Sequence, residues 1–238
     1  TNINAGCGAM HPEHVAAVAR QSRADIGIAV DGDADRVVLV DERGEIVDGE
    51  QVLGMCALDM KRRQALSRDA VVGTVMSNLG LERALAGMGL ALVRADVGDR
   101  YVVEAMLREK INLGGEQSGH VVFLDQNTTG DGMLTALQVL GLMRREDRPL
   151  SELARVMERT PQVLHAVRVR SKPELESLPE LSIALARVER KLAGRGRLLV
   201  RYSGTEPVAR VMLEGDDRAE IETIALELCA LIEREIGE

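Results

Sequence analysis

Three aspartates, each two residues apart, are the feature of this sequence most suited to chemistry. Residues 31–36 read Asp-Gly-Asp-Ala-Asp-Arg and stand between two apolar stretches that are typical of buried strands. This spacing in an extended loop turns Asp31, Asp33 and Asp35 to the same side, where their carboxylates repel one another unless a cation lies among them. Carboxylate oxygens suit Mg²⁺, which keeps open positions for water or a phosphate oxygen. The sequence therefore predicts a magnesium site at these three aspartates.

Two alternatives to a magnesium loop are a polar turn and an EF-hand. A polar turn with an Asp-Gly hairpin signal accounts for residues 31 and 32 without any ligand. An EF-hand calcium loop is not expected, because residues 39–43 are typical of a strand and a turn rather than of the second half of that loop.

A second polar loop, residues 114–120, reads Gly-Gly-Glu-Gln-Ser-Gly-His and precedes an apolar strand. Its glycines keep the backbone open, so that a ligand can come close. Glu116 and Ser118 are two residues apart and can face one ligand, and a carboxylate with a hydroxyl can grip sugar hydroxyls by hydrogen bonds. His120 could orient a phosphate or assist proton transfer. A tight turn with a hydrogen-bonded histidine is the simpler alternative.

A third polar segment, residues 201–207, reads Arg-Tyr-Ser-Gly-Thr-Glu-Pro and is followed by Arg210. Two hydroxyls, backbone N–H groups at a glycine and two arginines together suit an oxyanion, and the arginine fork matches the geometry of phosphate. In an acidic protein this combination predicts a local phosphate site. A capped hairpin turn with surface arginines is the alternative.

Strands and helices alternate over most of the chain, which predicts a parallel α/β layer. We expect helices at 12–21, 50–63, 79–87, 98–110 and 132–145, strands at 25–30, 37–40, 45–47, 70–74, 90–94 and 121–124, and a turn at 113–115. After residue 160 the pattern changes to that of a small α+β domain. Its expected elements are strands at 163–169, 198–201 and 208–213 and helices at 179–194 and 217–236.

The composition limits the classes of function. The 238 residues have a net charge of −8 and only 1% aromatic residues, which argues against a nucleic-acid partner. We expect no membrane partner, because no apolar run is long enough to span a bilayer and no signal peptide opens the sequence. Cys7, Cys56 and Cys229 are far apart and odd in number, so they fit neither a disulfide framework nor a zinc site and indicate a reducing cytoplasm.

The three polar loops, in this order, resemble those of the α-D-phosphohexomutase superfamily. Its members carry a magnesium loop like residues 31–36, a sugar-specificity loop Gly-Glu-x-Ser-Gly-His and a phosphate-binding loop Ser-Gly-Thr-Glu-Pro. The resemblance covers nearly all the chain and is strongest to the bacterial members that interconvert glucosamine 6-phosphate and glucosamine 1-phosphate. The segments that carry it are Thr1–Asn4, Val97–Val102, Gly115–His120, Thr128–Gly132 and Ser203–Pro207.

The resemblance implies a role for each polar loop. Asp31, Asp33 and Asp35 would hold Mg²⁺ beside a phosphoserine, and Arg36 would lie next to the transferring phosphoryl group. Glu116 and Ser118 would hold sugar hydroxyls with His120 close by. The phosphate that does not react would be held by Arg201, Ser203, Gly204, Thr205 and Arg210. The implied reaction passes through a bisphosphorylated sugar and serves UDP-N-acetylglucosamine and cell-wall precursor synthesis.

The resemblance also implies an architecture of α/β class. We expect mixed three-layer α/β domains, one of them truncated, followed by a C-terminal α+β domain. Residues 1–47 would end the second of four domains, 48–159 would form the third and 160–238 the fourth. The family's phosphorylated serine lies in the first domain, so the expected partners are a sugar phosphate and the missing N-terminal domains. The chain alone is expected to be inactive, and the resemblance allows a homodimer.

Two departures and two rival functions accompany the resemblance. Ala34 stands where glycine is usual, and we expect it to be small enough to fit; Tyr202 stands where proline is usual. The nearest rival is a phosphomannomutase or phosphoglucomutase on the same scaffold. The rival of another class is a non-catalytic module that binds sugar phosphates.

Overall fold

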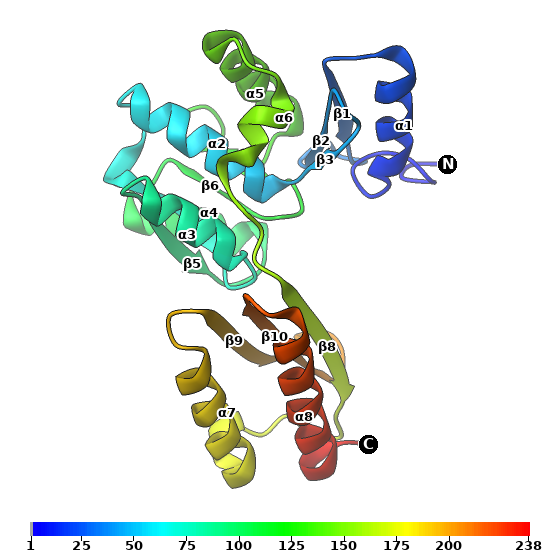
Figure 1. Cartoon of the computed structure of the whole chain (residues 1–238), viewed down its shortest axis with the longest axis vertical. Helices are drawn as coiled ribbons and strands as arrows, with labels where there is room; N and C mark the ends of the chain where they lie inside the picture. Colours follow the sequence, from blue (N-terminus) through cyan, green and yellow to red (C-terminus); the bar gives the residue numbers. More distant parts are fainter. Residues whose placement is uncertain (1) are drawn as a thin grey trace. The chain divides into compact units, whose positions relative to one another are not determined.

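The computed structural model describes residues 2–238, which form two compact units, one extending to Glu158 and the other Arg159–Glu238 (Figure 1). Thr1, the first residue of the motif Thr1–Asn4, lies outside the described residues. A finer division of the first unit at residue 47 stays a prediction. No helix within residues 2–238 is both long and apolar enough to cross a membrane.

The first unit begins with a small antiparallel sheet that carries the aspartate loop. Its order is β1 (Ile26–Val30), β2 (Val37–Asp41) and β3 (Ile46–Val47), and helix α1 (Pro12–Ser22) packs against it through small residues. Strand β1 pairs with β2 from Ile26↔Asp41 to Val30↔Val37. The aspartate loop therefore closes a regular hairpin, and the pairing of β1 with β2 fixes the positions of both ends of the loop.

The second sheet has the order β5 (Ala91–Ala95), β4 (Ala70–Thr74), β6 (Leu113–Gly115) and β7 (Val121–Phe123). Strands β5, β4 and β6 are parallel, whereas β7 is antiparallel to β6. The prediction of a parallel layer was therefore wrong for this edge, because the turn at 116–120 returns the chain directly to its neighbour. The mixed α/β class is confirmed.

The expected turn at 113–115 was also wrong, because these residues form strand β6. Packing rather than a turn favours its glycines: a Cβ on Gly115 would lie 2.4 Å from the His120 carbonyl oxygen, and one on Gly114 would lie 2.7 Å from Met106 Sδ on the adjacent helix. The sequence pattern also missed the short helix α6 (Leu150–Leu153) and the 3₁₀ turns Ser67–Asp69, Ala154–Val156 and Leu175–Ser177.

Helices cover both faces of the second sheet, which makes three layers. Helix α4 (Asp99–Glu109) packs on one face with Ala70, Val72 and Val122. Helices α2 (Gly49–Arg62), α3 (Leu79–Gly87) and α5 (Gly132–Glu146) pack on the other with Val71, Val121 and Phe123. Successive strand residues alternate between the two cores, so these strands are buried on both sides.

The second unit is an antiparallel sheet covered by two helices. The strand order is β8 (Gln162–Arg168), β10 (Val208–Gly215) and β9 (Gly196–Tyr202). Helices α7 (Pro179–Leu192) and α8 (Arg218–Ile236) lie side by side on one face and close its apolar core (Figure 1). Asp217 caps α8 by accepting from the Ala219 and Glu220 amides, as its place before the helix predicts. The expected α+β arrangement is confirmed.

Candidate functional site

The structure brings the three aspartates together. Each offers a carboxylate oxygen, and these oxygens lie within 4.8 Å of one another. The loop is held at its base, where the Arg36 amide donates to Asp31 Oδ1 at 3.2 Å. Helix α5 supports it from outside, because the Gly132 amide donates to the Ala34 carbonyl at 2.8 Å. The convergence predicted from the spacing by two is confirmed as geometry; the role as metal ligands stays a proposal.

The charges of this group are incompletely balanced. Burial of Asp35, followed by the neighbouring charges of Asp31 and Asp33, raises the pKa of the Asp35 carboxyl above its ordinary value, against an opposing effect of His120. Arg36 Nε lies 3.8 Å from both Asp31 Oδ2 and Asp35 Oδ1, too far for a hydrogen bond, and has no other partner among residues 2–238. Three carboxylate oxygens within 4.8 Å of one another, with the Arg36 guanidinium loosely placed beside them, fit the donor set of Mg²⁺.

The structure excludes an EF-hand. Glu42 stands at the twelfth position counted from Asp31, so residue counting alone leaves that possibility open. The sixth position is Arg36 rather than glycine, and the next five residues form strand β2 instead of a ligand loop. The Glu42 carboxylate accepts hydrogen bonds from Ser151 on α6, which lowers the pKa of Glu42 despite its burial.

Ala34 stands where the family usually has glycine, and the structure shows that backbone conformation matters at this position. Its φ of 61° lies in the left-handed region, which costs a residue with a Cβ about 1–2 kcal/mol and costs glycine almost nothing. Glycine is therefore favoured here by backbone conformation rather than by lack of space. The neighbouring contacts to Asp31 and Gly132 hold the alanine in this conformation.

The loop 116–120 is a tight turn that joins β6 to β7. The Glu116 amide donates to the His120 carbonyl at 2.9 Å, and the Gly119 amide donates to the Glu116 carbonyl at 3.1 Å. One oxygen of the Glu116 side chain accepts from the Gly98 amide at 2.9 Å, and the other lies 3.5 Å from Ser118 Oγ. Glu116 and Ser118 thus lie on the same side as expected, with Ser118 exposed.

His120 connects this turn to the aspartate loop. Its side chain is 1% exposed, and Nε2 accepts from the Gly130 amide at 3.2 Å while lying 3.8 Å from Asp35 Oδ2. The backbone of His120 forms a bridge with Arg36, and the Val37 amide donates to the Gly119 carbonyl. These contacts fit the simpler expectation of a hydrogen-bonded histidine, and they bring the two loops into one site.

Sequence reasoning missed Asp99 as a member of this group. Its carboxylate lies within 4.8 Å of ligand atoms of Asp35 and His120, at the first turn of α4. The signal was present in Gly98-Asp99, a glycine and an acid that follow strand β5 and open a helix. The sequence pattern predicts only that this pair starts a helix and belongs to a segment of resemblance, because nothing in the sequence shows that Glu116 holds the Gly98 amide.

The expected phosphate-binding residues all lie in the second unit. Arg201 on β9 and Arg210 on β10 are direct cross-strand partners, an unfavourable juxtaposition of like charges unless an anion lies near. Arg210 pairs with Glu206 at 2.7 Å, whereas Arg201 Nε is buried without a hydrogen-bond partner. Ser203 is buried, and Gly204 and Thr205 are exposed at the tip. Arg201 therefore belongs to a strand and not to the exposed loop.

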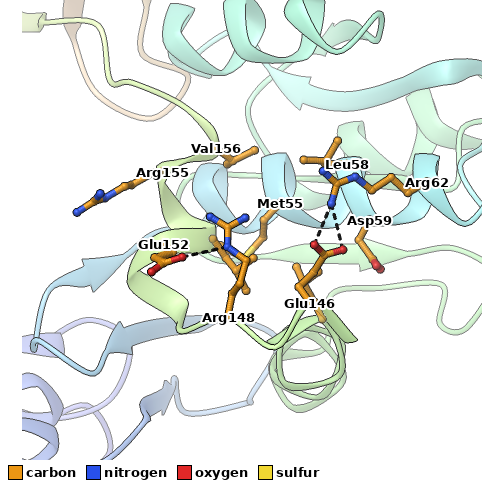
Figure 2. A pocket seen from close by; sticks show the side chains of 11 residues that line it. Met55, Leu58, Asp59, Arg62, Glu146, Arg148, Glu152, Arg155 and Val156 are labelled. Atoms are coloured by element: carbon orange, nitrogen blue, oxygen red, sulfur yellow. Dashed lines mark hydrogen bonds and ion pairs between the residues drawn. The ribbon is translucent and has the colours of Figure 1, made fainter. Parts of the chain in front are cut away.

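A cavity of about 290 Å³ lies elsewhere in the first unit (Figure 2). It is lined by Met55, Leu58, Asp59, Arg62, Leu142, Glu146, Arg148, Glu152, Leu153, Arg155 and Val156. Arg62 forms a forked pair with Glu146, and Arg148 pairs with Glu152, so most of its charges are already neutralised (Figure 2). None of the expected site residues lines it. The cavity lies along the later part of α2, whereas the 116–120 turn contacts Gly49 at the start of that helix. The cavity and the turn are therefore at different parts of α2.

Two family models match the chain. Residues 48–160 match the model described as phosphoglucomutase/phosphomannomutase, alpha/beta/alpha domain III. Residues 164–231 match the model described as phosphoglucomutase/phosphomannomutase, C-terminal domain.

Curated relatives match over the whole chain. The phosphoglucosamine mutase of Syntrophotalea carbinolica is 54% identical over 237 residues, which cover 100% of this chain and 52% of the relative. The phosphoglucosamine mutase of Magnetococcus marinus is 56% identical over 234 residues, covering 98% of this chain and 48% of the relative. The chain therefore spans about half the length of the curated relatives it matches.

Solved structures share the fold. One is the N-acetylphosphoglucosamine mutase of Aspergillus fumigatus in complex with GlcNAc-6P and magnesium. It has a TM-score of 0.69 and 21% identity, and the match covers 95% of this chain and 56% of that one. At this identity the likeness establishes the architecture alone.

Proposed function

Because the chain belongs to the phosphoglucomutase/phosphomannomutase family, we propose that it forms part of an enzyme that interconverts glucosamine 6-phosphate and glucosamine 1-phosphate. The enzyme would be an isomerase that works by intramolecular phosphoryl transfer. In this proposal residues 1–47 end the second domain, 48–159 form the third and 160–238 the fourth. The missing N-terminal domains supply the phosphoserine.

Each loop has a defined part in the proposed reaction. The phosphoserine gives its phosphoryl group to the free hydroxyl of the sugar monophosphate, and the other phosphoryl group of the resulting bisphosphate passes back to the serine. Bound Mg²⁺ would neutralise charge on the transferring group. Asp31, Asp33 and Asp35 hold that ion, and Arg36 lies beside the transferring phosphoryl group.

Each unit has its own binding role in this proposal. Glu116 and Ser118 of the first unit bind sugar hydroxyls, and His120 lies close by, with its backbone bridged to Arg36 of the aspartate loop. Arg201, Ser203, Gly204, Thr205 and Arg210 bind the phosphate that does not react. The observation that supports the proposal best is the bridge between Arg36 and His120, because it puts the proposed metal loop and the proposed sugar loop in one site.

The test is a chimaera in which the part of the Syntrophotalea carbinolica relative outside the match is joined to this chain. We expect it to convert glucosamine 6-phosphate in the presence of Mg²⁺ and a trace of the bisphosphate. Residues 1–238 alone should show no turnover, since phosphoryl transfer needs the donor serine. Turnover by the chain alone, or an inactive but folded chimaera, would contradict the proposal. Faster conversion of glucose or mannose phosphates would favour the rival mutases.

Replacing Arg201 by alanine should weaken binding of glucosamine 6-phosphate to this chain by about 1.5–3 kcal/mol, the range for a charged hydrogen bond. The reason is that Arg201 Nε is buried and has no hydrogen-bond partner in the described part of the chain that would compete with the phosphate. Calorimetric or NMR titration measures the effect. Arg187→Ala, which removes an exposed arginine from α7, is the matched control and should bind normally. Equal affinity of the two variants would remove Arg201 from the site.

A further inference from the structure

The segment that follows β8 lies against the loop 203–207. The Val169 amide donates to the Pro207 carbonyl at 2.9 Å, and the Arg170 amide donates to the Ile236 carbonyl at 3.0 Å. The segment is thereby fixed between the loop and the end of α8. Two residues further on, Lys172 Nζ donates to the Ser203 carbonyl at 2.6 Å. A charged side chain from a distant part of the sequence thus holds one carbonyl of the proposed phosphate-binding loop.

Holding the Ser203 carbonyl also fixes the next amide. In a planar trans peptide, the carbonyl oxygen and the following N–H point in opposite directions. The ammonium group of Lys172 therefore turns the Gly204 N–H away from itself. No hydrogen bond of the Gly204 amide to another described residue is found, and the residue is exposed at the tip of the loop. This amide is available to an incoming oxyanion.

The orientation of this peptide is not determined by Gly204 itself. Its φ is outside the left-handed region, and a Cβ at this position would meet nothing within 4 Å. Rotation of the Ser203–Gly204 peptide by about half a turn would give Gly204 a positive φ, which glycine adopts as readily as a negative one. The rotated peptide would present a carbonyl oxygen to the anion instead of an N–H.

We propose that Lys172 is a positioning residue of the phosphate-binding loop, which keeps the Gly204 N–H directed at the phosphate by holding the Ser203 carbonyl. This inference rests on the proposed function of the loop and adds a residue outside the motif Ser203–Pro207. A lysine is suited to the task because its ammonium group forms a strong charge-assisted bond to one carbonyl. Its charge adds to those of Arg201 and Arg210 in attracting an anion.

The test uses the ¹⁵N-labelled full chain titrated with inorganic phosphate and then with glucosamine 6-phosphate, followed by amide NMR. Lys172→Met should weaken phosphate binding about tenfold, the loss typical of one charged hydrogen bond. Lys172→Arg keeps a charged donor and should restore most of the affinity. Lys191→Met, which removes a lysine that pairs with Glu220, is the matched control and should bind as the unaltered chain does.

Positioning has a signature that is visible without phosphate. In Lys172→Met the Gly204 amide resonance should shift or broaden before any ligand is added, while amides of α7 and α8 remain unchanged and the urea midpoint stays close to that of the unaltered chain. Unaltered phosphate affinity, or an unperturbed Gly204 resonance, in Lys172→Met would overturn the positioning role alone. Absence of any phosphate response in the unaltered chain would overturn the proposed phosphate loop as well.

Discussion

Replacing Gly119 by alanine is expected to destabilise the first unit by at least about 3 kcal/mol. Gly119 has a φ of 93°, which disfavours any residue with a Cβ, and a Cβ built there would lie 2.0 Å from the Val37 carbonyl oxygen. That oxygen belongs to strand β2 and cannot move away as a flexible side chain could. The carbonyl of the same glycine accepts from the Val37 amide, so the change would separate the 116–120 turn from the aspartate loop.

Urea unfolding of the full chain measures the effect, with the transition of the first unit read apart from that of the second. Gly87→Ala is the matched control, because this glycine lies at the end of α3 with an ordinary φ and with nothing within 4 Å of an added Cβ. The control should be stabilised by about 0.4–1 kcal/mol. Comparable stability of the two variants would show that the close contact between Gly119 and Val37 is not required.

Replacing Asp33 by alanine is expected to affect metal binding and stability in opposite directions. Loss of one of three carboxylates should weaken Mg²⁺ binding by more than about tenfold and slow the chimaera by at least about a hundredfold. Without metal, the same change should raise stability at neutral pH, because the Asp33 charge raises the pKa of Asp35. Because this pKa is raised in the folded state, the free energy of unfolding falls as the pH rises from the unfolded-state pKa of Asp35 through the raised one. The loss is complete above the raised pKa.

The gain in stability should therefore begin to shrink as the pH falls through the raised pKa of Asp35, and it should vanish at lower pH, where that carboxyl is protonated in both proteins. Calorimetric titration with Mg²⁺ and thermal unfolding at several pH values measure the two effects. Glu109→Ala removes one negative charge from the last turn of α4, outside the cluster, and should leave Mg²⁺ binding unchanged. Equal Mg²⁺ affinity in Asp33→Ala and the unaltered chain would show that Asp33 is not a ligand.

The sequence was most informative where local chemistry determines the structure. The sequence predicts that Asp31, Asp33 and Asp35 converge, and the structure confirms that their carboxylate oxygens lie together. The expected reason was wrong, because the loop is not extended: the Ala34 amide donates to the Asp31 carbonyl, and Ala34 has a left-handed φ. The long helices were found because their apolar periodicity and their caps agree. Asp217 before α8 and Pro12 at the start of α1 mark the first turns.

The errors occurred where a distant neighbour determines the conformation. Leu113–Gly115 contains the residues of a turn, yet it forms a strand because β4 and β7 lie on either side and Met106 needs the space above Gly114. The expectation that Ala34 is small enough to fit is not contradicted, but it did not reveal the left-handed φ that the hairpin and α5 impose on this residue. Propensity is a weak guide whenever tertiary contacts outweigh it.

What the sequence by itself determined is the set of polar loops, the order in which they occur and the α/β class that carries them, since side-chain chemistry and apolar periodicity are local properties. Only the tertiary structure decided which groups meet. The Arg36–His120 bridge, the Gly98 amide on Glu116, Asp99 beside Asp35 and Lys172 on the Ser203 carbonyl all join residues that are remote in the sequence. Such contacts depend on how strands pair and helices pack, because the free energy of the whole fold, and no single residue, fixes those distances.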